Sequence, residues 1–197
     1  MKRLKLSPVQ FVLASFFQSV TPRTAGFNTV DIGSLTQPTL LLLIFLMFVG
    51  GSPGGTAGGI KTTTFTVLIF LLINAYRERA PIVISGRTIP LKTIRKAVFI
   101  FGFALTLILV STFLILLNQG HELTFLQVLF EVTSAFGTVG LSTGITTKLS
   151  TFSRLIIILT ILTMFIGRVG PLTIMVSFSF RKTKAIPQYP EGDVAVG

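Results

Sequence analysis

The sequence contains no cysteine and no tryptophan, and its single histidine is His121. The missing thiols exclude disulfide bonds and thiolate metal sites, although they do not indicate a redox compartment. One histidine cannot form a His pair, and the sequence shows no Ser/His/Asp arrangement of the kind used in nucleophilic catalysis. We therefore expect no enzyme, and we interpret His121 as a solvated residue of a short polar turn.

Charge is also scarce, because only 12% of the 197 residues are Asp, Glu, Lys or Arg, about half the share of a typical soluble domain. Half of the residues are apolar, 19 are Phe, and the mean hydropathy is +0.83. These values predict an all-α membrane protein. The 17 basic and 6 acidic residues give a net charge of +11. The basic residues lie in short clusters between apolar runs, which favours cytoplasmic loops over a nucleic-acid surface.

A repeated pentapeptide organises the chain. Thr24-Ala25-Gly26-Phe27-Asn28 has an echo 114 residues later, Thr138-Val139-Gly140-Leu141-Ser142. Each copy reads Thr, small apolar residue, Gly, bulky apolar residue, small polar residue. That order resembles the Thr-Val-Gly-Tyr-Gly loop of potassium channels, whose backbone carbonyls replace the hydration shell of the ion. The two copies are therefore predicted to be filter loops of an ion pathway.

Each predicted loop follows a short apolar run, at residues 7–20 and 123–136. About 13 helical residues rise roughly 20 Å, against about 30 Å of bilayer hydrocarbon. We therefore predict re-entrant pore helices, with a buried or interfacial helix as the alternative for the first run. Ser7 is expected to cap that helix and Pro8 to occupy its first position.

The longer apolar runs divide the chain into two repeats. Residues 97–117 predict a complete span, residues 155–180 a last span, and residues 39–49 and 60–75 the two halves of a broken one. The predicted organisation is as follows: 1–76, a pore helix, filter loop and broken transmembrane helix; 77–96, a cytoplasmic loop; 97–180, a complete helix–pore–helix repeat; 181–197, a cytoplasmic C-terminal tail.

The break in the second span is rich in glycine. It contains Pro53 and six glycines, Gly50, Gly51, Gly54, Gly55, Gly58 and Gly59. At about 1 kcal/mol per Gly and about 3 kcal/mol for Pro, a continuous helix is disfavoured by roughly 9 kcal/mol. Irregular backbone at membrane depth is tolerated where protein buries it or where it lines a cavity. We predict a gate that extends to Lys61, with close helix packing as the alternative. A phosphate loop is disfavoured, because Ile60 separates the glycines from Lys61 and no strand precedes them.

Two ionisable residues lie within the predicted membrane segments. Glu131 is expected to support a filter loop by accepting hydrogen bonds or by pairing with a basic residue such as Arg23, and direct ion binding is the alternative. Arg168 in mid-span costs about 3 kcal/mol or more. The 114-residue offset places it opposite Gly54, below the filter loops, where carbonyls freed by the break could hold it and its charge would oppose a passing cation. A purely structural role in a helix bundle is the alternative for Arg168.

Four stretches carry a resemblance to a known family. They are residues 15–29 (SFFQSVTPRTAGFNT), 50–64 (GGSPGGTAGGIKTTT), 130–142 (FEVTSAFGTVGLS) and 167–171 (GRVGP). The chain resembles the C-terminal half of the membrane subunit of the Trk/Ktr/HKT potassium transporter superfamily, and its tail is more like the bacterial Ktr branch. The family fold has four repeats of span, pore helix with filter loop, and span. This chain is similar to repeats three and four, and the first two are missing.

The resemblance implies specific site residues. The implied ion-binding filter residues are Thr24, Ala25, Gly26, Phe27, Thr138, Val139, Gly140 and Leu141, with potassium as the substrate and no cofactor. The implied gate residues are Gly50, Gly51, Gly54, Gly55, Gly58, Gly59, Lys61 and Arg168. The resemblance also implies a multi-pass protein of the cell membrane, in contact with lipid and not with nucleic acid. Family members work as homodimers with a cytoplasmic nucleotide-binding regulatory subunit.

The leading functional expectation is potassium uptake through a channel-like pathway gated by the Gly-rich loop. Two loops cannot enclose an ion, so one alternative is a truncated or partner membrane subunit that conducts only with the missing repeats. Another is a sodium-conducting relative.

Overall fold

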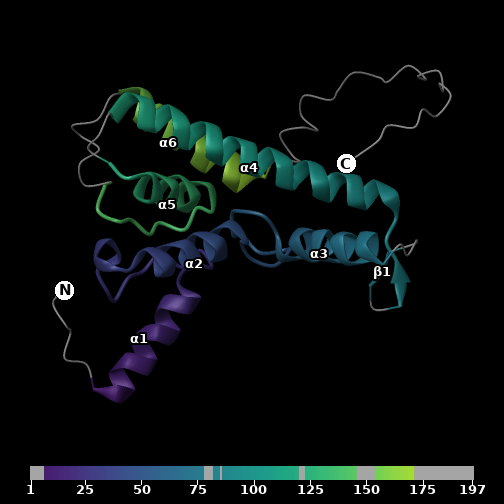
Figure 1. Ribbon diagram of the computed structural model, residues 1–197, viewed down its shortest axis with the longest axis horizontal. Coiled ribbons are helices and arrows are strands. Elements are labelled where there is room, and N and C mark those ends of the chain that lie inside the picture. Colours follow the sequence, from purple (N-terminus) through teal and green to yellow (C-terminus); the bar gives the residue numbers. More distant parts are fainter. Residues whose placement is uncertain (1–6, 78–81, 85, 120–122, 146–153, 171–197) are drawn as a thin grey trace.

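The computed structural model describes residues 7–77, 82–84, 86–119, 123–145 and 154–170, and this part of the chain is almost entirely helical (Figure 1). The helices are α1 (Pro8–Val20), the 3₁₀ turn η1 (Ile32–Ser34), α2 (Gln37–Phe48), α3 (Thr62–Tyr76), α4 (Leu91–Gln119), α5 (Phe125–Phe136) and α6 (Arg154–Val169). A short antiparallel hairpin, β1 (Val83–Ile84) and β2 (Arg87–Thr88), connects α3 with α4. The predicted all-α class is confirmed.

Helix α5 is the centre of the packing, because it contacts α2, α4 and α6. Two groups of buried side chains lie on either side of it. One joins α2, α5 and the second filter loop: Ile32, Leu40, Leu43, Ile44, Met47, Phe130, Val139 and Leu141. The other joins α4, α5 and α6: Ile60, Ala104, Ile108, Ile115, Val128, Val132, Phe136 and Ile156. The helix that leads into the second filter loop is therefore fixed on several sides.

Helix α1 has the predicted start but little packing. The Ser7 hydroxyl accepts a hydrogen bond from the Gln10 amide at 3.3 Å, the Gln10 side chain accepts one from the Ser7 amide at 3.0 Å, and Pro8 occupies the first helical position. No residue of α1 is buried. In Figure 1, α1 slants away below α2, while α4, α5 and α6 lie on the other side of α2. The first filter loop thus follows a helix that the described core does not enclose.

Helix α4 is longer than the predicted span at residues 97–117. Its apolar stretch Leu91–Asn118, 28 residues long, is the one helix of the described ranges that is long and apolar enough to cross a membrane. The helix begins directly after Pro90, because nothing in the following residues breaks it. Lys92, Arg95 and Lys96, which the sequence assigns to the loop of residues 77–96, belong to the first turns of α4.

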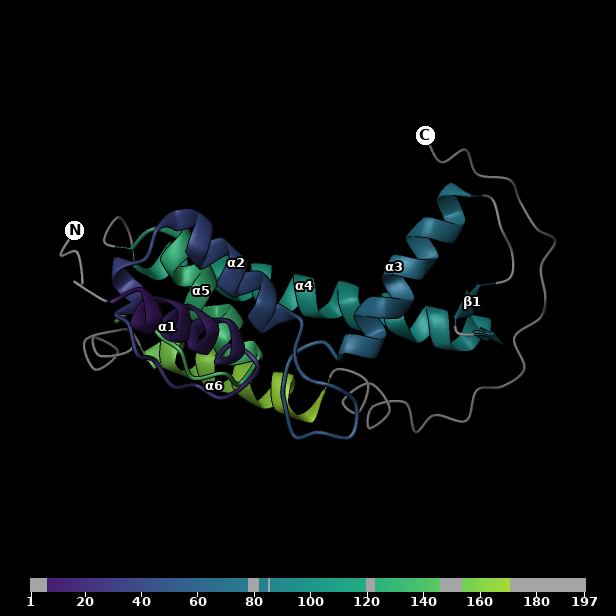
Figure 2. The same cartoon turned by 90° about the horizontal axis from the view of Figure 1, so that it is seen from below.

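The predicted break between residues 49 and 60 is present. Helix α2 ends at Phe48 and α3 begins at Thr62, and the two helices are not collinear (Figure 2). The segment between them returns to its starting point: the Gly50 amide donates to the Ile60 carbonyl at 2.8 Å, and the Ile60 amide donates to the Phe48 carbonyl at 3.0 Å. The Gly-rich segment is therefore a loop closed at its neck by backbone hydrogen bonds.

Helix α6 accounts for the first part of the predicted last span. The predicted interruption at residues 167–171 begins later than expected, because Gly167 and Arg168 are still helical and α6 ends at Val169. The remainder of the predicted span, the predicted tail at residues 181–197, and His121 lie outside the described residues.

The crossing of α6 over the end of α5 depends on Gly167. A methyl group at this position would overlap the Phe136 carbonyl oxygen and would lie 2.7 Å from the Phe136 carbonyl carbon. We expect Gly167→Ala to lower the stability of the full-length protein by about 1–3 kcal/mol through overpacking. Thermal unfolding in detergent would show this as a fall in Tm of several degrees.

Gly102→Ala, in the middle of α4, is the matched control. An added methyl group meets no atom within 4 Å there, and Ala is the better helix former, so Tm should stay unchanged or rise slightly. Equal Tm values for the Gly167→Ala variant and the parent protein would contradict the close crossing.

Candidate ion pathway

The two predicted filter loops share one unusual backbone conformation. Thr24 and Gly26 have φ values of +69° and +75°, and Thr138 and Gly140 have φ values of +50° and +90°. The residue between each pair has no positive φ. Alternating φ signs turn successive carbonyls toward the same side, whereas the carbonyls of an extended strand alternate. Each loop can therefore present a row of carbonyl oxygens.

The two loops lie against each other. A methyl group on Gly26 would overlap the Val139 carbonyl oxygen, and one on Gly140 would lie 3.8 Å from the Gly26 Cα. The positive φ of Gly26 and this close approach both require glycine at position 26. The structure thus brings together two loops that are 114 residues apart in the sequence.

The second loop is anchored through its side chains. Val139 and Leu141 are buried, with 4% and 3% of their surface exposed, so these side chains face the core. The Ser134 hydroxyl at the end of α5 donates to the Leu141 carbonyl at 2.6 Å, and the Val139 amide donates to the Ser134 carbonyl at 2.9 Å. Burial of the side chains leaves the backbone of this loop as its outward surface.

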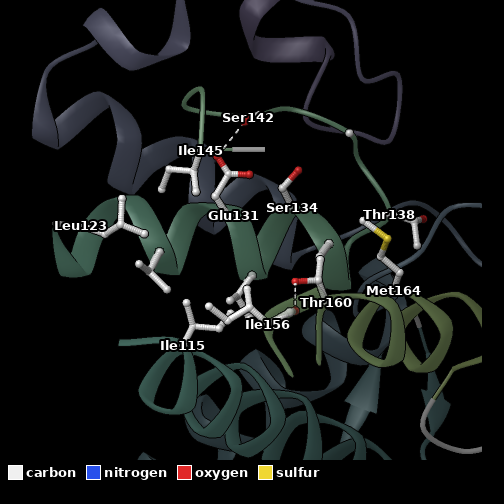
Figure 3. Close-up of a pocket in the computed structure, with 14 residues that line it drawn as sticks. Ile115, Leu123, Glu131, Ser134, Thr138, Ser142, Ile145, Ile156, Thr160 and Met164 are labelled. Atoms are coloured by element: carbon white, nitrogen blue, oxygen red, sulfur yellow. Dashed lines mark hydrogen bonds between the residues drawn. The ribbon is translucent and has the colours of Figure 1, made fainter. Parts of the chain in front are cut away.

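Glu131 supports the same loop from behind (Figure 3). Its Oε1 accepts hydrogen bonds from the Ser142 hydroxyl at 2.8 Å, the Thr143 amide at 2.7 Å and the Thr143 hydroxyl at 2.8 Å. The predicted scaffolding role is confirmed as a set of hydrogen bonds to the filter loop. The alternative pairing with Arg23 is wrong, because the Arg23 guanidinium binds elsewhere, to the Val49 and Gly50 carbonyls.

The first loop is held by fewer contacts. The Thr21 hydroxyl donates to the Phe27 carbonyl, and the Ala25 amide donates to the Thr21 carbonyl at 3.1 Å. The Phe27 side chain is 71% exposed. In both loops, then, a hydroxyl at the end of the pore helix binds the carbonyl of the residue that follows the glycine.

These anchoring hydroxyls were not found from the sequence. At the 114-residue offset, Thr21 corresponds to Ala135, and Ser134 corresponds to Val20. The two hydroxyls make the same hydrogen bond from positions that differ by one residue at this offset, so a comparison of equivalent positions does not find them. A Ser or Thr in the last helical turn or at the C-cap position before each loop is the signal that marks them.

The Gly-rich loop lies against the second filter loop. A methyl group on Gly58 would lie 2.6 Å from both the Gly137 carbonyl oxygen and the Thr138 hydroxyl oxygen. The Lys61 ammonium donates to the Gly55 carbonyl at 3.2 Å and to the Ala57 carbonyl at 2.6 Å. Lys61 therefore fastens the loop to its own neck, and Gly58 leaves no space between the loop and the filter.

Arg168 lies in the last turn of α6 and is exposed. Figures 1 and 2 agree in placing this end of α6 beside the Gly-rich loop. Arg168 makes no hydrogen bond with another residue of the described ranges. Carbonyls freed by the break accept instead from Arg23 and Lys61, which corrects the expectation that they hold Arg168.

A cavity of about 320 Å³ lies between α5, α6 and the second filter loop (Figure 3). Its walls are mostly apolar and include Ile115, Ile156 and Met164, while Glu131 and Thr138 contribute polar groups. The Thr138 hydroxyl is buried and has no hydrogen-bond partner among the described residues. Among the residues that the structure describes, no group of three or more His, Cys, Asp or Glu residues is suited to a metal ion.

Removing the Glu131 carboxylate should disturb the second loop. Glu131→Ala removes the acceptor of three partly buried hydrogen bonds, and one such bond contributes about 0.5–1.5 kcal/mol. We expect a fall in Tm and weaker discrimination between potassium and sodium in transport assays of the full-length protein. Glu131→Gln should be milder, because its amide oxygen still accepts.

Asp31→Asn provides the control for this experiment. Asp31 is exposed, and its carboxylate accepts a hydrogen bond from the Gly33 amide at 3.1 Å. The Asp31→Asn variant should therefore change little in Tm and in the discrimination between potassium and sodium. Equal effects of Glu131→Ala and Asp31→Asn would show that the contacts of Glu131 do not support the loop.

The sequence of this chain matches a known protein family and several known transport proteins. Residues 5–186 match the cation transport protein family TrkH. Ktr system potassium uptake protein B of Bacillus subtilis is 43% identical over 93% of this chain and 40% of its own length. The protein of the same name from Vibrio alginolyticus is 39% identical over 94% of this chain and 39% of its own length. The potassium/sodium uptake protein NtpJ of Enterococcus hirae is 36% identical over 93% and 41%.

The fold has a counterpart among solved structures. The potassium transporter TrkH from Vibrio parahaemolyticus superimposes with a TM-score of 0.67 and 23% identity, over 88% of this chain and 38% of that one. The chain thus spans about two fifths of the length of these relatives. Because the family match extends over residues 5–186, this chain belongs to the TrkH family of cation transport proteins, membrane transporters rather than enzymes, and its resemblance to the Trk/Ktr superfamily is confirmed.

Proposed function

We propose that this chain forms part of the wall of a potassium uptake pathway. The observation that carries the proposal is the contact between two loops with the same alternating φ pattern. The ion would be coordinated by the carbonyls of Thr24, Ala25, Gly26, Thr138, Val139 and Gly140. Carbonyl oxygens replace the hydration shell of potassium in channel filters. The carbonyls of Phe27 and Leu141 already accept hydrogen bonds from hydroxyl groups, so their role is to anchor the loops.

A complete pathway needs more than two loops. The relatives are about two and a half times as long as the matched segment, which supports further repeats around the same axis. We propose a multi-pass protein in which residues 1–76 and 97–180 form two of four repeats. The family resemblance supports a homodimer with a cytoplasmic nucleotide-binding regulatory subunit. A truncated or partner subunit that conducts only with the other repeats is the alternative.

Sodium is the second candidate substrate. The similarity to a protein named potassium/sodium uptake protein supports it. The chemistry of the two filter loops fits either ion, because carbonyl oxygens can bind both potassium and sodium. Competition between the two ions in a transport assay distinguishes these candidates.

The Gly-rich loop is proposed as the gate. It lies directly against the second filter loop at Gly58 and is closed at its neck. The Lys61 ammonium places positive charge on the loop. Arg168 adds a second positive charge in the last turn of α6, and that end of α6 lies beside the loop in Figures 1 and 2. A cation that leaves the filter would meet this charge and the backbone of the loop, so conduction requires the loop to move.

The filter proposal predicts a loss of selectivity on Gly26→Ser. The added side chain would overlap the Val139 carbonyl and would strain a residue at φ +75°. We expect the full-length variant to discriminate potassium from sodium at least about tenfold less well, since one displaced ligand changes binding by about 1.4 kcal/mol or more. Potassium uptake in a deficient bacterial strain, measured with and without excess sodium, checks this.

Gly144→Ser is its control. Gly144 also has a positive φ, of +99°, but an added Cβ there meets no atom within 4 Å. This variant carries the same backbone strain without the contact between loops, and it should keep its selectivity. Unchanged selectivity in Gly26→Ser would remove the filter assignment.

The gate proposal predicts higher flux when the obstruction is reduced. Deletion of residues 52–55 shortens the Gly-rich loop, and Arg168→Ala removes a charge beside it. We expect both to raise potassium flux several-fold under conditions in which the parent protein is mostly closed. Arg154→Ala, at the opposite end of α6 and also exposed, is the control and should leave flux unchanged. Parent-like flux in both test variants argues against the gate.

A further inference from the structure

Arg23 connects the first filter loop with the Gly-rich loop. One terminal nitrogen of its guanidinium, Nη1, donates to the Val49 carbonyl at 2.8 Å and to the Gly50 carbonyl at 3.0 Å. Both acceptors are buried in the neck of the Gly-rich loop. The side chain therefore bridges 26 residues of sequence between the two irregular segments of the pathway.

The acceptors exist because α2 ends at Phe48. In a continuing helix, the Val49 and Gly50 carbonyls would accept from amides four residues later. The chain instead turns into the loop, and the carbonyls at the negative end of the helix dipole remain available to a cation. A charged donor makes stronger hydrogen bonds than a neutral one, and arginine keeps its charge in proteins.

Arg23 is also part of the turn that forms the filter. Its amide donates to the Val20 carbonyl at 3.0 Å, and its carbonyl accepts the Thr24 hydroxyl at 2.6 Å. The next residue, Thr24, has φ +69°, a conformation that a residue with a Cβ keeps only when its surroundings hold it. The backbone that sets this turn and the guanidinium that holds the neck thus belong to one residue.

The second filter loop is connected to the Gly-rich loop differently. At the 114-residue offset, Gly137 takes the place of Arg23. A methyl group on Gly137 would lie 2.9 Å from the Met47 carbonyl oxygen, and one on Gly58 would lie 2.6 Å from the Gly137 carbonyl oxygen. Backbone therefore packs directly on backbone at the second loop. At the first loop, the connection between filter and neck runs through the Arg23 side chain.

We propose that Arg23 is a positioning residue that fastens the hinge of the gate to the first filter loop, so that displacement of either one is transmitted to the other. The proposal rests on the ion pathway proposed above. Val49 and Gly50 form the fixed end of the Gly-rich loop, because they are held to Ile60 by the neck and to the filter by Arg23. Residues 51–59 can then move while the hinge keeps its register beneath the first filter loop.

The test compares Arg23→Gln with Lys61→Gln in the full-length protein. Lys61 holds the same loop through the Gly55 and Ala57 carbonyls but has no hydrogen bond to the filter. Hydrogen–deuterium exchange of the purified protein in lipid nanodiscs is followed in peptides that cover residues 21–28 and 49–60. For Arg23→Gln we expect faster exchange in both peptides, by roughly tenfold, since two charge-assisted hydrogen bonds are lost. For Lys61→Gln we expect faster exchange only in the peptide that covers residues 49–60.

Transport supplies the second readout. Arg23→Gln should raise flux and lower the discrimination between potassium and sodium, whereas Lys61→Gln should raise flux with unchanged discrimination. Two results for Arg23→Gln would overturn the proposed link between filter and hinge. One is faster hydrogen–deuterium exchange in only one of the two peptides, and the other is unchanged discrimination between potassium and sodium. Arg23→Lys, which keeps the charge on a compact ammonium, should show the same pattern to a smaller extent, and it decides the question if the Gln variant does not fold.

The two proposals fail separately. If the parent protein carries no potassium but Arg23→Gln accelerates exchange in both peptides, the ion pathway is wrong and the mechanical link stands. If the parent protein transports potassium and Gly26→Ser lowers selectivity, but Arg23→Gln behaves like Lys61→Gln, the pathway stands and the link is wrong.

Discussion

The need to satisfy backbone polar groups without water governs this structure. Inside a bilayer, amides and carbonyls that leave a helix must find partners in the protein or face a water-filled space. Among the described residues, the two filter loops and the Gly-rich loop are segments that leave helical geometry. Glu131, Ser134 and Thr21 satisfy the filter loops, and Arg23, Lys61 and the hydrogen bonds of the neck satisfy the Gly-rich loop. The carbonyls of the Thr–X–Gly stretches are the groups that an ion can satisfy.

The same constraint explains why the cationic side chains gather around the break. A helix that stops within the membrane exposes carbonyls at its C-terminal end, and these attract positive charge. Arg23 donates hydrogen bonds to the carbonyls at the end of α2, and Lys61 donates to carbonyls within the Gly-rich loop. Lys61 stands at the N-terminal end of α3, where the helix dipole is unfavourable to a cation, so its contacts with the carbonyls offset that repulsion. Both side chains thus satisfy backbone carbonyls that the break leaves without helical partners.

Features set by local sequence could be predicted, and features set by long-range contacts could not. The lengths of α1 and α5, the cap at Ser7 and the break after α2 follow from nearby residues, and the structure has each of them. The echo at Thr24 and Thr138 also located two loops that prove to touch. Of the two scaffolding contacts considered for Glu131, the pairing with Arg23 is wrong, because sequence shows opposite charges but not which carbonyls a helix end leaves free. The start of α4 was placed too late for a similar reason: a basic cluster suggests a loop, yet lysine and arginine are good helix formers.

The exposure of α1 has a consequence for how the molecule becomes ordered. The core around α5 encloses the second filter loop, whereas no residue of α1 is buried and Phe27 stands clear of that core. Cooperative folding units are held together by buried apolar contacts, and segments with few of them open at low free energy. The part of the chain from α2 to α6 can therefore form one such unit, with the first pore helix as a late addition. Its order in the membrane depends on whatever neighbour covers it, and the completeness of the ion pathway becomes a matter of assembly as much as of folding.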